Sequence, residues 1–146
     1  MNFIAWLEQY SIPYFIAWGY ENLPDQHSGG DVDMYIHPEH YAMVAEELAR
    51  RNYSSAKCPA YGSDHKHEQF AQSGCYSLHL FSNFCFDFMG KTLVLTIDPQ
   101  QILQDRTKWK EFWVSSPMVE MLFTALRILG GRKDANCMER IKKHSF

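Results

Sequence analysis

Apolar positions in the first third of the chain change from a helical period to strand-like patterns. They recur at helical spacing over residues 3–10, and Pro13 should end that helix because proline disfavours helical geometry in the residue before it. The apolar run 14–18 is typical of a buried strand. Segment 20–30 is rich in turn-forming residues and predicts a loop, whereas the alternating segment 31–36 predicts the next strand.

The middle of the chain combines one amphipathic helix with short strands. Pro38 is suited to the first turn of a helix, and an apolar stripe continues that helix to residues 51–52. The polar, histidine-rich segment 59–74 is expected to be a loop. Short apolar or alternating runs predict four further strands, at residues 53–58, 75–81, 84–89 and 92–97.

Helical patterns dominate after Pro99. A first helix is predicted around residues 102–103, and the aromatic cluster 109–113 continues the helical pattern. A cap formed by serine and proline at 115–117 predicts the start of a longer helix, which the glycine pair 130–131 should end.

These elements predict the α/β (α+β) class, with a mixed sheet flanked by helices. No linker, internal repeat or low-complexity tract interrupts the chain. We therefore expect one domain over residues 1–146, with a sheet-rich core over about 1–98 and a helical part over about 99–146.

Composition and charge narrow the class of protein. The 146 residues are 46% hydrophobic and 15% aromatic, which is typical of a globular domain that forms its core without a structural metal. Residues 1–126 carry 8 basic and 15 acidic side chains, whereas residues 127–146 carry 6 basic and 2 acidic ones. The acidic body, together with a pI of about 6.1 for the whole chain, argues against a module that binds duplex DNA. Two interpretations of the basic tail stay open: it contacts a triphosphate or an acceptor, or it is a helix face exposed to water.

Cysteine use and hydropathy indicate the compartment. The four cysteines form no Cys-x-x-Cys pair, and no secretory leader precedes them, so we expect reduced thiols and a cytoplasmic protein. Glu8 and Pro13 interrupt the apolar N-terminus before it reaches membrane length, so no membrane partner is expected.

Two aspartates carry the main chemical signal. Asp31 and Asp33 stand at i and i+2 in a predicted strand, so their side chains share one face. Two carboxylates on one face require a positive partner, and Mg²⁺ prefers such oxygen ligands together with substrate phosphates. Because an Asp-x-Asp pair arises easily by chance, its surroundings must decide.

Those surroundings are specific. A predicted buried strand ends at Gly19, a loop follows, Asp31 and Asp33 begin the next strand, and an isolated Asp87 lies in a later apolar strand. This order resembles the nucleotidyltransferase fold of the DNA polymerase β superfamily. Its signature is a strand, a Gly-Ser turn, roughly ten residues, an Asp-x-Asp pair and a later third acidic residue. The 12 residues from Gly19 to Asp31 suit that signature.

A longer run refines the resemblance. Gly19-Tyr20-Glu21-Asn22-Leu23-Pro24, followed by Gly30-Asp31-Val32-Asp33, is similar to a bacterial branch associated with the biosynthesis of polysaccharides and other surface glycans. The resemblance covers about residues 14–130. Tyr20 stands where the superfamily usually has a serine that helps to hold phosphates, which shifts the expected phosphate contact to backbone amides near residues 28–30.

The resemblance implies an activity and its residues. Asp31 and Asp33 would hold Mg²⁺, for which Mn²⁺ can substitute, while Asp87 would complete a second metal position and help to activate an acceptor hydroxyl. The nucleotide-binding residues that it implies are Gly19, Tyr20, Ser28, Gly29 and Gly30. The expected reaction transfers a nucleoside monophosphate from an NTP to a hydroxyl or phosphate acceptor and releases pyrophosphate. A sugar phosphate, a protein and an RNA end all remain as acceptors.

Other readings of the same residues stay open. Asp31 could cap a turn, Asp33 could face solvent, and Asp87 could lie on the wet face of an edge strand. Cys58, His65, His67 and Cys75 form a rival zinc set, although their spacing is not that of paired zinc ligands, and His79 is expected to be a hydrogen-bonded strand residue.

A second function is also possible for this fold. The chain could be a catalytically degenerate binding module that acts through a helical partner protein, as in toxin-antitoxin systems, because Tyr20 departs from the usual signature. The aromatic content would also support a homodimer.

Overall fold

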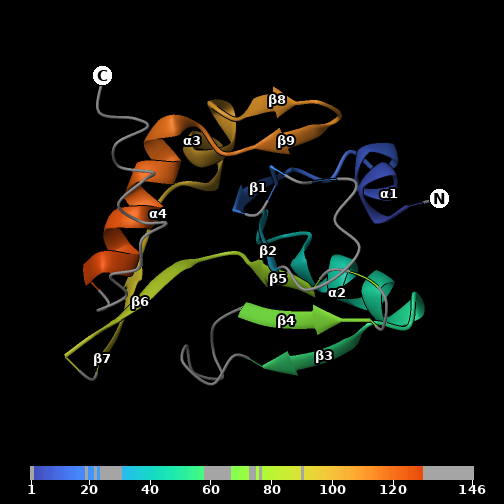
Figure 1. Ribbon diagram of the computed structural model, residues 1–146, viewed down its shortest axis with the longest axis horizontal. Coiled ribbons are helices and arrows are strands. Elements are labelled where there is room, and N and C mark those ends of the chain that lie inside the picture. The colour runs from blue at the N-terminus through green and yellow to red at the C-terminus, as the bar shows by residue number, and fades with distance from the viewer. Residues whose placement is uncertain are drawn as a thin grey trace.

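The computed structural model contains a seven-stranded mixed sheet, helices on both of its faces, and a separate two-stranded sheet (Figure 1). It describes residues 2–18, 20–21, 23, 31–57, 67–72, 75, 77–89 and 91–129. Along the chain the elements are α1 (Phe3–Gln9), β1 (Tyr14–Trp18), β2 (Asp31–Ile36), α2 (Tyr41–Arg50), β3 (Ser54–Lys57), β4 (His67–Ala71), β5 (Ser77–Phe81), β6 (Phe84–Phe88), β7 (Lys91–Leu95), α3 (Pro99–Gln104), β8 (Thr107–Trp109), β9 (Phe112–Val114) and α4 (Pro117–Leu129).

The large sheet has the strand order β3-β4-β5-β2-β1-β9-β8, with β2 at its centre. β2 runs antiparallel to β1 and parallel to β5, while β9 runs parallel to β1. β6 and β7 pair antiparallel with each other in the small sheet. The mixed α/β class is therefore confirmed.

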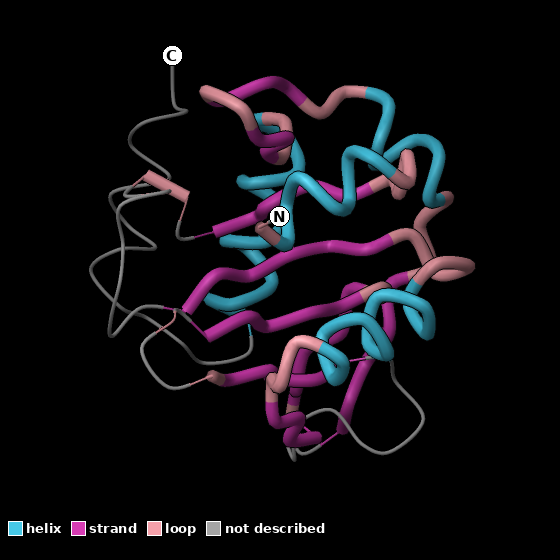
Figure 2. Tube along the Cα trace, turned by 90° about the vertical axis from the view of Figure 1, so that its right-hand side faces the viewer, coloured by secondary structure: helices cyan, strands magenta, loops and turns pink. Residues whose placement is uncertain are grey.

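Two hydrophobic clusters cover the two faces of β2, because strand side chains alternate between faces. Val32, Met34 and Ile36 pack in the cluster that includes residues of α1 and α2. Tyr35 packs in the other cluster, with Phe81, Phe84 and residues of α3 and α4. Figure 1 shows α1 and α2 at one side of the molecule and α4 at the other, and in Figure 2 the first two helices lie in front of the strands.

Most elements of the first half agree with the sequence patterns. α1, β1 and β2 are confirmed at the predicted positions. α2 begins at Tyr41 rather than at Pro38, because residues 38–40 form a turn in which His40 donates its N–H to the His37 carbonyl. The prediction that 59–74 is a loop is wrong for His67–Ala71, which form β4 between β3 and β5.

The second half differs more. β7 does not extend the large sheet, and all five of its residues are exposed. The helical prediction for 109–113 is wrong, because Thr107–Trp109 and Phe112–Val114 form a hairpin whose turn includes Lys110 at φ 53°. β9 then adds to β1, so the large sheet takes two strands from the part expected to be helical. The predicted cap and long helix at α4 are confirmed, whereas the predicted stop at 130–131 lies outside the described residues.

Among the described residues, no helix combines the length and the apolar character that crossing a bilayer requires.

Candidate active site

On one face of β2, the solvent exposure of the side chains decreases along the strand. Asp31 is exposed, Asp33 is half-buried with a side chain 14% exposed, and Tyr35 is buried. The residues between them, Val32 and Met34, are fully buried on the opposite face. Asp31 and Asp33 therefore share a face at the starting end of the central strand, as the sequence predicts.

Asp33 lies in a row of side chains that crosses four strands. Its neighbour on β1 is Trp18, its neighbour on β5 is His79, and Gln69 of β4 follows next to His79. The His79 Nδ1 atom is 2.9 Å from the Asp33 Oδ1 atom. The prediction that His79 is a hydrogen-bonded strand residue is confirmed.

Asp31 has a neutral neighbour. The register aligns it with Ser77 of β5, whose hydroxyl accepts a hydrogen bond from the Gln69 amide nitrogen at 3.4 Å. On the described part of this sheet face, the acidic side chains of β2, β4 and β5 are thus Asp31 and Asp33. Their carboxylate oxygens are hard ligands that suit one Mg²⁺ ion, and because Asp31 is exposed, water or a phosphate oxygen could complete the coordination of such an ion.

The backbone of Asp87 lies elsewhere. It is on β6, opposite Thr92 of β7, in the small sheet. β6 begins after Phe81, the β5 residue aligned with Tyr35, whereas Asp31 and Asp33 lie at the starting end of β2. In Figure 1, β6 leaves the end of β5 and extends away from the large sheet. The structure brings Asp31, Asp33 and His79 together but does not bring the backbone of Asp87 to them, so its metal role stays a prediction.

The predicted nucleotide-binding residues are covered in part. Gly19, Ser28, Gly29 and Gly30 lie outside the described residues. Tyr20 is buried, and its ring meets the Trp109 ring edge-on with 5.8 Å between centroids. The Tyr20 ring therefore packs in the protein, against the β8–β9 hairpin.

A second group of metal-type donors lies at the other end of β2. Donor atoms of His37, Glu39 and His40 fall within 4.8 Å of one another, and His37 Nδ1 accepts the Glu39 backbone N–H at 3.3 Å. Imidazole donors suit zinc, nickel or copper better than magnesium. This group was not predicted from the sequence, although its residues form the local motif His-x-Glu-His. In the rival zinc set, Cys58 and His65 lie outside the described residues, and Cys75 is exposed.

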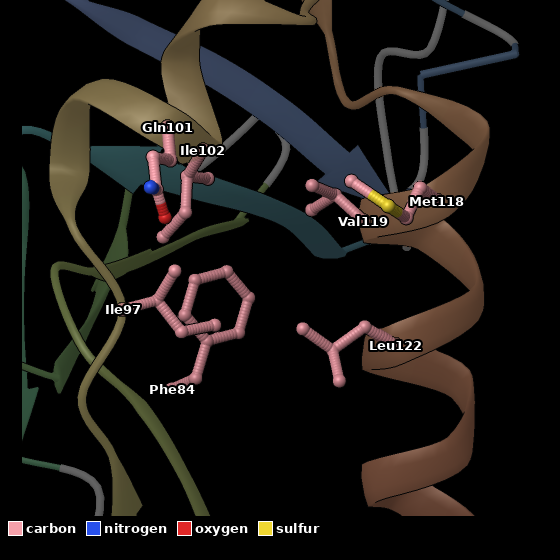
Figure 3. Close-up of a pocket in the computed structure, with 7 residues that line it drawn as sticks. All are labelled: Phe84, Ile97, Gln101, Ile102, Met118, Val119 and Leu122. Atoms are coloured by element: carbon pink, nitrogen blue, oxygen red, sulfur yellow. The ribbon is translucent and has the colours of Figure 1, made fainter.

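An apolar cavity of about 290 Å³ lies between β6, α3 and α4 (Figure 3). It is lined by Phe84, Ile97, Gln101, Ile102, Met118, Val119 and Leu122. The Phe84 ring also stacks on Tyr35, with 5.8 Å between centroids. The cavity therefore adjoins the same sheet face as Asp33, but its lining carries no carboxylate that could hold a metal.

The hydroxyl of Tyr35 stays protonated at neutral pH. Burial raises the pKa of Tyr35 to about 12, with a smaller contribution from the negative charge of Asp98. Tyr35 therefore adds no negative charge to this face at neutral pH.

Comparisons with known proteins identify similar solved structures, but no related sequence family. No protein-family model and no curated protein matches the chain. The lincomycin-bound crystal structure of the lincosamide antibiotic adenylyltransferase LnuA is 14% identical, covers 97% of this chain and 90% of its own, and has a TM-score of 0.60. The solution structure of the antibiotic-resistance factor ANT(2'')-Ia is 10% identical, covers 97% of this chain and 78% of its own, and has a TM-score of 0.58. Both neighbours are nucleotidyltransferase-fold proteins, and this chain therefore has the nucleotidyltransferase fold.

Proposed function

We propose that this protein is a divalent-cation-dependent nucleotidyltransferase, which transfers a nucleoside monophosphate from an NTP to a hydroxyl or phosphate acceptor. The observation that carries the proposal is the placement of Asp31 and Asp33 on one face at the starting end of the central strand. Both structural neighbours support nucleotidyl transfer as the general reaction.

Asp31 and Asp33 would hold Mg²⁺ or Mn²⁺ through carboxylate oxygens. When bound, such an ion neutralises charge on the phosphates and on the leaving pyrophosphate. In the reaction, an acceptor oxygen forms a bond to the α-phosphorus while the bond from that phosphorus to the bridging oxygen breaks. We assign phosphate contacts to the segment 19–30, which contains the predicted nucleotide-binding residues Gly19, Tyr20, Ser28, Gly29 and Gly30.

One set of observations favours a second candidate function. The described face of β2, β4 and β5 carries two carboxylates, the Asp87 backbone lies in another sheet, and the Tyr20 ring is packed against Trp109. A chain with these features could bind nucleotide without turnover and act through a protein partner.

Calorimetry with each of the four ribonucleoside triphosphates in the presence of Mn²⁺ tests the proposal, followed by a pyrophosphate-release assay with candidate acceptors. We expect the wild type to bind at least one NTP and the double variant Asp31→Asn/Asp33→Asn to lose that binding. Asp105→Asn is a matched control, because Asp105 is an exposed acid at the end of α3. Binding that is equal in the wild type and the double variant would overturn the proposal. Binding without pyrophosphate release from any tested acceptor, combined with recovery of a stable partner, would favour the second candidate.

A further inference from the structure

We infer that His79 is a positioning residue, which holds the Asp33 carboxylate in the orientation that cation binding needs. The inference rests on the proposed function, because it gives His79 a role at the same site. No sequence motif marks this residue, and 46 positions separate it from Asp33.

The hydrogen bond indicates which ring nitrogen of His79 carries a proton. An ionised carboxylate can accept a hydrogen bond but cannot donate one, so at 2.9 Å the His79 Nδ1 atom must carry the proton that Asp33 Oδ1 accepts. The length is normal for a hydrogen bond to a charged oxygen.

The backbone beneath this pair is rigidly placed. β2 and β5 are neighbouring parallel strands, and five successive residue pairs are in register from Asp31 with Ser77 to Tyr35 with Phe81. Leu78 and Leu80, on either side of His79, are buried on the opposite face. The imidazole therefore approaches Asp33 from a fixed point in the sheet.

The surroundings shield the pair in part from water. The His79 and Asp33 side chains are 23% and 14% exposed, and Trp18 adjoins Asp33 on the other side. The hydrogen bond from His79 to Oδ1 restricts rotation of the Asp33 carboxylate. Loss of such a partner typically weakens metal binding or activity by about 10–100-fold.

The test measures Mn²⁺ binding in the presence of a saturating non-hydrolysable NTP, by electron paramagnetic resonance of the free ion. We expect His79→Ala to raise the Kd for Mn²⁺ by about 10–100-fold. His79→Asn should recover at least part of that loss, because its amide nitrogen can donate to Asp33. Gln69→Ala should stay within about twofold of the wild type. It is the matched control, since Gln69 lies on the same face and its side-chain amide donates a hydrogen bond to Ser77.

Activity gives a second readout that a purely structural role would not produce. The Mn²⁺ concentration for half-maximal rate should rise in His79→Ala, while kcat at saturating Mn²⁺ stays near the wild-type value. Wild-type Mn²⁺ affinity in His79→Ala, with loss of binding in Asp33→Asn, would overturn this inference and leave the proposed function intact. Equal Mn²⁺ binding by the wild type and Asp33→Asn would overturn both. If His79→Ala does not fold, His79→Asn against His79→Leu gives the same comparison, and equal Mn²⁺ affinity in these two would overturn the inference.

Discussion

The ring of Phe15 stacks on the ring of Tyr35, with centroids 4.9 Å apart and planes 10° from parallel. Phe15 comes from β1 and Tyr35 from β2, and both are almost completely buried. Tyr35 follows Asp33 by two positions on the same face. This aromatic pair is therefore the buried apolar surface next to the candidate site.

We expect Phe15→Ala to lower the free energy of unfolding by about 3–5 kcal/mol, because it leaves a cavity and removes the stacking partner of Tyr35. Phe15→Leu keeps most of the apolar volume and should cost less. Urea denaturation of both variants checks this expectation. A loss below about 1 kcal/mol in Phe15→Ala would mean that the β1–β2 core is not packed as described.

Alkaline pH should lower the stability of the protein. Burial is the main cause of a raised pKa at Tyr14, Tyr35 and Tyr41, and for Tyr35 the value is about 12. A folded-state pKa above the unfolded value of about 10 means that the folded protein keeps a proton that the unfolded chain releases. The stability from each tyrosine is therefore present below about pH 10 and is lost as pH rises through the folded-state pKa, which for Tyr35 is about 12.

Urea denaturation at pH 8, 10 and 11 measures this loss, and absorbance of the phenolate follows the titration itself. The slope should reach about 1.4 kcal/mol per pH unit for each affected tyrosine. Tyr35→Phe should show a shallower slope. Stability that is unchanged between pH 8 and 11 would contradict the buried state of these phenols.

Two cations lie against one indole ring of the β8–β9 hairpin segment and also contact the N-terminal part of the chain. Arg106 Cζ and Lys108 Nζ lie 4.5 and 4.2 Å from the Trp113 ring centroid, and Arg106 Nη1 donates to the Tyr14 carbonyl at 3.2 Å. Lys108 Nζ also donates to Glu8 Oε1 at 3.1 Å. The half-buried Arg106 should matter more than the exposed Lys108, because solvent weakens the interactions of an exposed charge.

Thermal denaturation of Arg106→Ala and Lys108→Ala tests this order. We expect a loss of about 1–2 kcal/mol for Arg106→Ala and below about 1 kcal/mol for Lys108→Ala. A larger loss for Lys108→Ala would show that the contact with Glu8, and not the Arg106 interaction, fixes the hairpin.

The family resemblance and the strand arrangement lead to different expectations for Asp87. If Asp87 completes the site, as the resemblance implies, then Asp87→Asn should lower turnover as much as Asp33→Asn. If β6 keeps it apart from Asp33, turnover should stay within about tenfold of the wild type, which is the outcome that the strand arrangement favours. Initial rates of pyrophosphate release for the two variants, at saturating NTP and Mn²⁺, decide between these outcomes.

Local patterns predicted the elements that depend on neighbouring residues. α1 ends before Pro13, β1 is a continuous apolar run, and β2 alternates, so their positions follow from the chain itself. The shared face of Asp31 and Asp33 follows from the period of a strand and needs no knowledge of the rest of the fold.

The errors lie where distant segments decide the structure. In β4, Phe70 is the fully buried residue and its neighbours are polar or exposed, so the strand depends on pairing with β3 and β5. Trp109, Phe112 and Trp113 have helical spacing, but pairing of β9 with β1 and the turn at Lys110 make them strand residues. The contact of His79 with Asp33 likewise requires the strand order β5-β2, which no local pattern contains.

Anomalous diffraction from crystals soaked with Mn²⁺ and a non-hydrolysable NTP tests the central claim most directly. We predict a Mn²⁺ ion within about 2.5 Å of carboxylate oxygens from both Asp31 and Asp33, with a phosphate oxygen as a further ligand. Nucleotide bound without Mn²⁺ at these two carboxylates, or Mn²⁺ bound at His37, Glu39 and His40 alone, would contradict the account.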